Sequence, residues 1–232
     1  MAARIGILGG SFNPVHVGHV RLAIEVRERL GLERVDLAPC SLPPHKPAAG
    51  LLDFALRKRL VELALAAADG LPAVEGLAVN ALEAARTGPS YTYDTLLHYR
   101  RTEPAAQLFF ILGGGDLLTL PQWRRGLELP WLAHFVVVPR DVHDLDDVAA
   151  FIAQTWPEAT ATPPAPPATA AWTFSAPAAS TQLVYLPVPR LDISGTQVRQ
   201  AWRDGKSLRY MLPAAVEREL IARREEINAV WR

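Results

Sequence analysis

The stretch that decides the fold is Gly9-Gly10-Ser11-Phe12-Asn13-Pro14-Val15-His16-Val17-Gly18-His19, which directly follows the apolar run Ile5 to Leu8. A run of this kind is typical of a strand buried on both faces, and the periodic segment Val20 to Leu30 indicates a helix. The stretch therefore lies in a strand-to-helix turn. In an open α/β sheet that turn lies at the carboxyl edge of the strands, where backbone amides and a helix N-terminus bind anions.

Two histidines in this turn, His16 and His19, are three residues apart. If the helix begins near Val17, both imidazoles point toward the same ligand. Two other interpretations are that the segment is only a turn, or that the two histidines form half of a metal site. A simple turn does not need two histidines, and no third His, Cys or carboxylate stands at ligand spacing. We therefore predict a ligand-binding pair and no metal ligands, and the lysine-bearing phosphate loop G-x-x-x-x-G-K-[ST] is absent.

The segment from Gly10 to His19 resembles the H-x-G-H signature of a superfamily that transfers nucleotidyl groups from ATP or CTP. Its context is similar to that of the bacterial nicotinate-nucleotide adenylyltransferases. The resemblance implies a single α/β domain with a doubly wound parallel sheet, the Rossmann-like nucleotidyltransferase fold. It also implies AMP transfer from ATP, accompanied by Mg²⁺, to nicotinate mononucleotide, which gives deamido-NAD and pyrophosphate.

Composition narrows the class of protein. The 232 residues are enough for one α/β domain with a full core. Lysine plus arginine equal aspartate plus glutamate at 24 each, so no overall positive charge favours a nucleic acid or a membrane as partner. No apolar run is long enough to span a bilayer, and the start Met-Ala-Ala-Arg-Ile has no secretory pattern. With Cys40 as the single cysteine, we expect a cytoplasmic protein whose partners are small-molecule substrates.

Two loop segments are similar to family segments that bind the substrates. Pro43-Pro44-His45-Lys46 follows a predicted strand at Val35 to Ala38; by itself it favours a solvent-exposed proline turn, but the resemblance places Lys46 near nucleotide phosphate. Pro89-Ser90-Tyr91-Thr92 precedes a helix predicted through Arg101. Ser90 suits a helix cap, and the resemblance implies that this segment recognises the pyridine carboxylate.

Two other helices are assigned to packing. The helix predicted over Asp53 to Ala68 has apolar residues at helical spacing, and its basic residues Arg57, Lys58 and Arg59 are expected to form a solvated face. A final helix is predicted from Ala214 to Ala229, with Pro213 in its first turn.

The glycine-rich segment Gly113-Gly114-Gly115-Asp116 follows the apolar strand Gln107 to Leu112. It fails the dinucleotide fingerprint G-x-G-x-x-G because Leu118 occupies the third glycine position. The family instead has Gly-x-Asp here, then a tryptophan that stacks on the pyridine ring, and Trp123 matches that tryptophan. Asp116 stands one residue closer to Trp123 than usual. We expect the glycines to use conformations closed to other residues and to direct Asp116 to a ribose.

The segment Ile193-Ser194-Gly195-Thr196-Gln197-Val198-Arg199 is the second chemical centre. Ser194 and Gln197 fit a capping box, which predicts a helix that starts directly after a strand with its amides facing the ligand. A capping box alone is usually structural. The segment resembles the family's triphosphate motif I-S-S-T-x-x-R, but Gly195 replaces the second serine. One hydroxyl contact is lost, so weaker or rearranged phosphate binding and a more mobile helix start are expected.

The resemblance divides the candidate site residues by role. Catalysis is assigned to His16, His19 and Arg199. Contacts with ATP are assigned to Gly10, Ser11, Phe12, Gly18, Lys46, Gly113, Asp116, Ile193, Ser194 and Thr196. Contacts with nicotinate mononucleotide are assigned to Asn13, Ser90, Tyr91, Thr92, Trp123 and Arg140, the last of which follows a strand predicted at Phe135 to Val138.

One segment stands outside the resemblance. Residues 157–181 are dense in Ala, Pro and Thr, which predicts a mobile surface insertion without regular structure. We expect that removing most of it leaves activity nearly unchanged.

Two other functions stay open. The first is a sister adenylyltransferase that acts on nicotinamide mononucleotide or phosphopantetheine; Trp123 and the Ser90-Tyr91-Thr92 segment disfavour this function. The second is a nucleotide sensor that binds nucleotide without turnover; the intact H-x-G-H motif disfavours this function.

Overall fold

The computed structural model describes residues 2–43, 49–68, 70–85, 88–139, 143–175 and 180–232. The chain divides into two compact units, the first made of residues 1–9, 25–35 and 91–190 and the second of residues 10–24, 36–90 and 191–232. Three elements, β1 (Arg4–Gly10), α1 (Val17–Leu30) and β2 (Arg34–Pro39), contain residues of both units. The organisation as a single domain stays a prediction.

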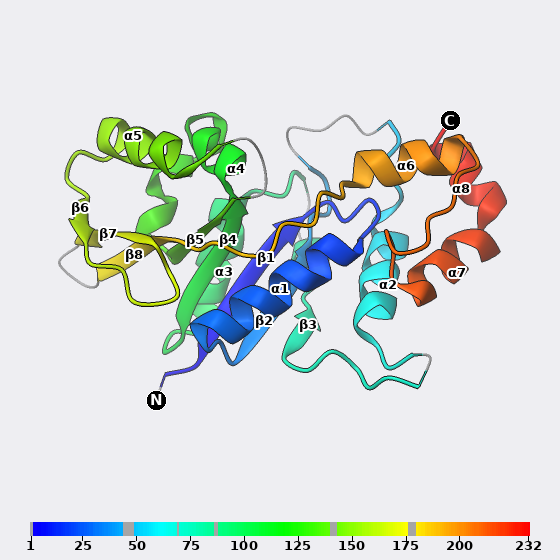
Figure 1. Cartoon of the computed structure of the whole chain (residues 1–232), viewed down its shortest axis with the longest axis horizontal. Helices are drawn as coiled ribbons and strands as arrows, with labels where there is room; N and C mark the ends of the chain where they lie inside the picture. Colours follow the sequence, from blue (N-terminus) through cyan, green and yellow to red (C-terminus); the bar gives the residue numbers. More distant parts are fainter. Residues whose placement is uncertain (1, 44–48, 69, 86–87, 140–142, 176–179) are drawn as a thin grey trace. The chain divides into compact units, whose positions relative to one another are not determined.

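The first unit is built on a mostly parallel sheet (Figure 1). Strands β1, β4 (Gln107–Gly113), β5 (His134–Val138) and β8 (Ser180–Tyr185) pair in that order, all parallel. Strands β7 (Ala170–Ser175) and β6 (Thr160–Thr162) continue the sheet in antiparallel pairing. The predicted α/β class with a mostly parallel sheet is confirmed.

The central strands carry uninterrupted apolar runs because both of their faces are covered. Every residue of β4 from Leu108 to Gly113 is buried, as are Phe135 to Val138 of β5. Such strands have no polar face and therefore no alternating pattern. The α-helices of this unit are α3 (Thr92–Thr102), α4 (Gly114–Leu118) and α5 (Leu145–Thr155), with 3₁₀ turns η2 (Leu120–Gln122) and η3 (Gly126–Trp131).

The expectation that residues 157–181 lack regular structure is wrong for the part of the segment that is described. Strand β7 pairs with β8 in a continuous register from Ala170 opposite Tyr185 to Ser175 opposite Ser180. Trp172 and Phe174 alternate with Thr173, and both aromatic residues are buried. This alternation is a strand pattern that the overall Ala, Pro and Thr content conceals. Residues 176–179 lie outside the described residues.

The second unit contains the C-terminal helices and the region around α2 (Phe54–Leu65). Its other elements are β3 (Leu77–Val79), η1 (Leu82–Ala85), α6 (Gly195–Arg203), α7 (Ala214–Ala222) and α8 (Arg224–Val230), the last three drawn orange to red in Figure 1. Helix α2 packs on α7 and β3. None of the helices in the described ranges is long and apolar enough to cross a membrane.

Two helix boundaries differ from the prediction. The helix expected over Ala214 to Ala229 is two helices, because Arg223 has non-helical backbone angles between them. Helix α2 ends at Leu65, since Ala66 is extended, and begins where Asp53 Oδ1 accepts a hydrogen bond from the Leu56 amide at 2.6 Å.

Candidate functional site

The two histidines of the strand-to-helix turn stack on each other in the second unit. The ring centroids of His16 and His19 are 3.6 Å apart with 30° between the planes, and the edge of Phe12 meets His19 at 4.9 Å. His16 is buried, whereas His19 is half-buried. The two imidazoles therefore lie side by side, and that they point toward a common ligand stays a prediction.

A backbone hydrogen bond fixes the tautomer of His19. The His16 amide donates to His19 Nδ1 at 3.2 Å, so Nδ1 has no proton and Nε2 carries the ring proton. His19 therefore presents a neutral N–H donor from Nε2.

Gly18 leaves room for the His16 ring. An ideal Cβ at this position would lie 3.1 Å from His16 Nδ1 and 3.2 Å from His16 Cε1, closer than ordinary van der Waals contact. A side chain at position 18 would therefore have to shift the ring of the first histidine by a few tenths of an ångström, so glycine suits this packing.

The turn before the histidines is held by the side chain of Asn13. Its Nδ2 donates to the Gly50 carbonyl at 2.7 Å, and its Oδ1 accepts from the Leu52 amide at 3.1 Å. Asn13 is buried, so its amide group organises the turn. The assignment of Asn13 to the mononucleotide stays a prediction.

The start of α6 faces the same turn. Ser194 caps the helix, since Ser194 Oγ accepts from the Gln197 amide at 3.2 Å and Gln197 Oε1 accepts from the Ser194 amide at 2.6 Å. The predicted capping box is confirmed. The expectation that the helix directly follows a strand is wrong, because residues 186–194 separate β8 from α6. The half-buried Ile193 precedes the cap.

Arg199 connects α6 to the histidine turn. Its Nη1 donates to the Asn13 carbonyl at 2.7 Å and its Nη2 to Thr196 Oγ1 at 3.1 Å. Burial and the charge of nearby Arg203 lower the pKa of Arg199 from its usual value. A guanidinium so placed brings positive charge to the turn and leaves further N–H donors for a phosphate.

The structure explains why Gly195 stands where the family motif has serine. An ideal Cβ at Gly195 would lie 2.9 Å from the Asn13 carbonyl oxygen and 3.3 Å from Arg199 Nη1. The close approach of α6 to the turn therefore leaves no space for a side chain. Gly195 adopts no positive φ, so the requirement is for space and not for backbone freedom.

We predict that Gly195→Ser, which restores the family residue, lowers affinity for ATP. The side chain would push the Asn13 carbonyl away and weaken its bond with Arg199, with an overpacking cost of about 1–3 kcal/mol. The Michaelis constant for ATP and the unfolding temperature measure the two effects. Gly9→Ser is the stability control, because its Cβ would meet only Phe110 at 3.8 Å. A Gly195→Ser enzyme with a wild-type Michaelis constant would contradict the steric explanation.

Arg57 is wrongly predicted as part of a solvated face. Its side chain is 1% exposed and donates four hydrogen bonds to backbone carbonyls. Burial lowers the pKa of Arg57 from its usual value. A signal was available in the sequence, because Arg57 stands three and seven residues before the buried Leu60 and Ala64, on the apolar side of α2.

Ser90 does not cap α3, contrary to the prediction. Its Oγ accepts hydrogen bonds from the amides of Ser41 at 2.8 Å and Leu42 at 3.3 Å, and Tyr91 occupies the cap position without a side-chain bond. Ser90 thus fixes the segment after β2. Lys46 and Arg140 lie outside the described residues.

Tyr91, Thr92 and Trp123, which are assigned to the mononucleotide, lie in the first unit, whereas Ser90 lies in the second. Thr92 begins α3, and the Tyr91 ring is covered by the guanidinium of Arg124 at 4.8 Å. Arg124 Nη1 also donates to Asp94 Oδ2 at 2.9 Å. Trp123 is half-buried and directly precedes Arg124. Arg124 was not identified from the sequence, where an exposed arginine has no distinguishing pattern.

The glycines before Asp116 do not adopt unusual conformations. None of Gly113, Gly114 and Gly115 has a positive φ, and α4 begins at Gly114, directly after β4. The expectation that these glycines use conformations closed to other residues is therefore wrong. Asp116 lies in the first turn of α4, where Oδ2 accepts from the Gly113 amide at 3.4 Å, and it is exposed.

We predict that Asp116→Ala raises a Michaelis constant, for ATP or for the mononucleotide, by about tenfold or more. A hydrogen bond from a ribose hydroxyl to a carboxylate contributes about 1.5–3 kcal/mol, and 1.4 kcal/mol corresponds to tenfold. Steady-state kinetics with each substrate varied in turn measure the effect. Unchanged Michaelis constants and turnover would leave Asp116 with only its role at the helix start.

No group of three or more His, Cys, Asp or Glu side chains within the described ranges could hold a metal ion.

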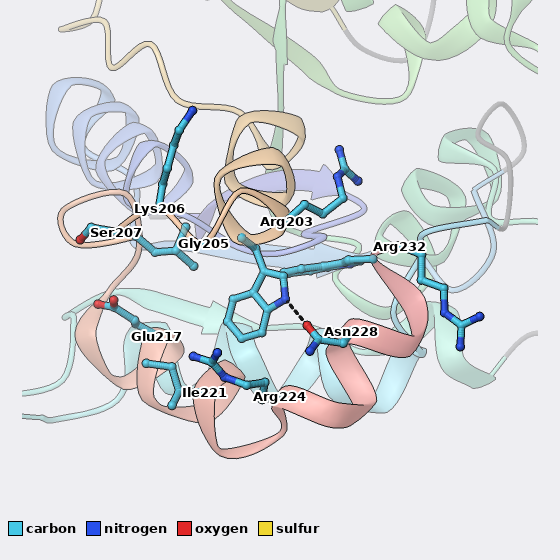
Figure 2. A pocket seen from close by; sticks show the side chains of 12 residues that line it. Arg203, Gly205, Lys206, Ser207, Glu217, Ile221, Arg224, Asn228 and Arg232 are labelled. Atoms are coloured by element: carbon cyan, nitrogen blue, oxygen red, sulfur yellow. Dashed lines mark hydrogen bonds between the residues drawn. The ribbon is translucent and has the colours of Figure 1, made fainter.

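A groove of about 720 Å³ lies at the other end of α6, between that helix, α7 and α8 (Figure 2). It contains none of the predicted site residues. Trp202 Nε1 donates to Asn228 Oδ1 at 2.8 Å across it. Lys206, Arg203 and Arg232 extend in different directions in Figure 2, so they do not converge on one anion.

Comparisons with known proteins agree with this geometry. The model of the cytidylyltransferase-like family matches residues 7–201. Proteins named "Probable nicotinate-nucleotide adenylyltransferase" from Chromohalobacter salexigens and Methylococcus capsulatus are each 40% identical, over 95% and 91% of this chain and 94% of their own. The solved structure of Plasmodium falciparum nicotinic acid mononucleotide adenylyltransferase complexed with NaAD has a TM-score of 0.73 over 97% of both chains at 16% identity, which shows the same fold. The chain belongs to the cytidylyltransferase-like family, among its nicotinate-nucleotide adenylyltransferases.

Proposed function

We propose that this chain transfers the AMP group of ATP to nicotinate mononucleotide and releases pyrophosphate. The observation that carries the proposal is the stacked pair His16 and His19 on a turn that Arg199 of α6 also contacts. This arrangement gathers an N–H donor, a guanidinium and the amides of a helix start in one unit. All three favour bound phosphate.

The reaction needs alignment and charge stabilisation more than proton transfer. A phosphate oxygen of the mononucleotide attacks the α-phosphorus of ATP, and the bond from that phosphorus to the bridging oxygen of pyrophosphate breaks. The attacking phosphate is already an anion, so no base has to remove a proton. His19 Nε2–H and the Arg199 guanidinium stabilise the negative charge that develops on the phosphoryl oxygens.

We propose that Mg²⁺ arrives with ATP as part of the substrate. Mg²⁺ commonly keeps several waters and binds substrate phosphates with few protein ligands, which fits a site rich in donors and cations. The residues of this chain then bind the outer phosphate oxygens. A cytoplasmic location is part of the same proposal.

The choice of mononucleotide is tested by comparing turnover. The enzyme is supplied with ATP and either nicotinate or nicotinamide mononucleotide, and pyrophosphate release is measured. A higher kcat/KM with nicotinate mononucleotide supports the proposal. Preference for nicotinamide mononucleotide or phosphopantetheine would indicate a sister transferase, and ATP binding without pyrophosphate release from any of them would indicate a sensor.

A further inference from the structure

Arg57 is a buried cation that the proposed reaction does not use. It projects from α2, and burial lowers its pKa more than the nearby charges of Asp53 and Glu83 raise it. Its guanidinium lies over the Phe54 ring at 5.6 Å and faces backbone oxygens. The N–H groups of a buried arginine need hydrogen-bond acceptors, and the positions of those acceptors indicate what the side chain holds in place.

The acceptors come from three separate segments. Arg57 Nη1 donates to the Ser11 carbonyl at 2.8 Å and to the Cys40 carbonyl at 2.7 Å. Nη2 donates to the Ser41 carbonyl at 3.0 Å, and Nε donates to the Leu52 carbonyl at 2.8 Å. One side chain therefore joins the turn after β1, the segment after β2 and the residues before α2.

The turn that contains Ser11 has a strained backbone. Phe12, the next residue, has φ of 44° although it carries a side chain, and it is 1% exposed. A non-glycine residue keeps such a conformation only where its surroundings impose it. The Cys40 amide also donates to the carbonyl of Gly10, the residue before Ser11, at 2.9 Å, so this hydrogen bond and Arg57 both connect the turn to the segment after β2.

We propose that Arg57 is a positioning residue for ATP, which sets the conformation of residues 10–13 by hydrogen-bonding the Ser11 carbonyl. This inference rests on the proposed function, since residues 10–13 lead into His16 and His19. Asn13, at the end of the turn, offers its carbonyl to Arg199. A displaced turn would therefore misplace both the histidine pair and the arginine that stabilises the phosphates.

The geometry requires the forked guanidinium and not only a positive charge. Lysine places one compact ammonium at the end of a flexible stem and cannot reproduce the fork that meets four carbonyls. We therefore expect Arg57→Lys to fold but to lose activity. Arg57→Met removes the charge and the donors while keeping most of the side-chain volume.

The experiment compares three variants at a temperature where circular dichroism shows each to be folded. The variants are Arg57→Lys, Arg57→Met and the matched control Arg59→Met, which removes an exposed charge from the same helix. Affinity for a non-hydrolysable ATP analogue is measured by calorimetry, and kcat and KM are measured with ATP and nicotinate mononucleotide. For both Arg57 variants we expect about tenfold weaker binding of the analogue and about 10²-fold lower kcat, the effect of a displacement of about 1 Å.

Each outcome decides the inference. Arg59→Met should match the wild type, and a folded Arg57→Lys with wild-type affinity and kcat overturns the positioning role. Lower unfolding temperatures with unchanged kinetics, or failure of both Arg57 variants to fold, would assign Arg57 to general stability and overturn it as well. If the wild-type enzyme does not use nicotinate mononucleotide, the proposed function fails, while affinity for the ATP analogue still decides the role of Arg57.

Discussion

Replacing His19 with alanine should lower kcat for adenylyl transfer by about 10²–10³-fold, the cost of removing one pre-positioned donor to developing charge. The hydrogen bond from the His16 amide to His19 Nδ1 leaves Nε2–H as the donor of the ring. Alanine removes this donor and also the acceptor of the His16 amide, so the fold of the variant has to be checked. Pyrophosphate release at saturating ATP and nicotinate mononucleotide measures kcat.

The control for His19→Ala is His98→Ala, which removes an exposed imidazole from α3 and should keep wild-type kcat. His19 is only half-buried, so the alanine variant should also fold, with a circular dichroism spectrum like that of the wild type. Retention of most of the turnover would show that the pair is not catalytic. An unfolded variant would show that His19 belongs to the core.

The sequence predicted the central strands well because burial on both faces produces continuous apolar runs. The predicted strands Gln107 to Leu112 and Phe135 to Val138 differ from β4 and β5 by one residue at one end each. Gly31 directly follows α1 with a φ of 59°, the left-handed conformation in which glycine commonly ends a helix. Local patterns were sufficient for these features.

Features that depend on contacts between distant residues were not predictable. Arg57 reaches the Ser11 carbonyl, 46 residues earlier, and Arg199 reaches the Asn13 carbonyl, 186 residues earlier. From sequence alone, an arginine on a helix is expected to be exposed. Whether it is buried depends on which distant segments pack against it. The steric need for glycine at position 195 was not predictable for the same reason, because the atom that leaves no space for a side chain is the carbonyl oxygen of Asn13.

The second large effect is expected for Phe174→Ala, in the segment first interpreted as a mobile insertion. Phe174 is 1% exposed, and its ring makes edge contacts with Trp131 at 5.7 Å and Trp156 at 5.4 Å. Removing a buried phenylalanine costs about 3–5 kcal/mol from lost burial and the cavity that remains. Denaturant unfolding measures the free energy, and the exposed Ser175→Ala on the same strand should change it by no more than about 0.5 kcal/mol.

The kinetics of Phe174→Ala separate packing from function better than a deletion does. Deleting residues 160–175 would remove β6 and β7 and expose the edge of β8, so a loss of activity could follow from unfolding alone. The point variant keeps the strand. If the segment serves only the core of the first unit, kcat and both Michaelis constants below the unfolding temperature should equal those of the wild type. A folded Phe174→Ala with weakened nucleotide binding would instead show that the segment acts on the substrates.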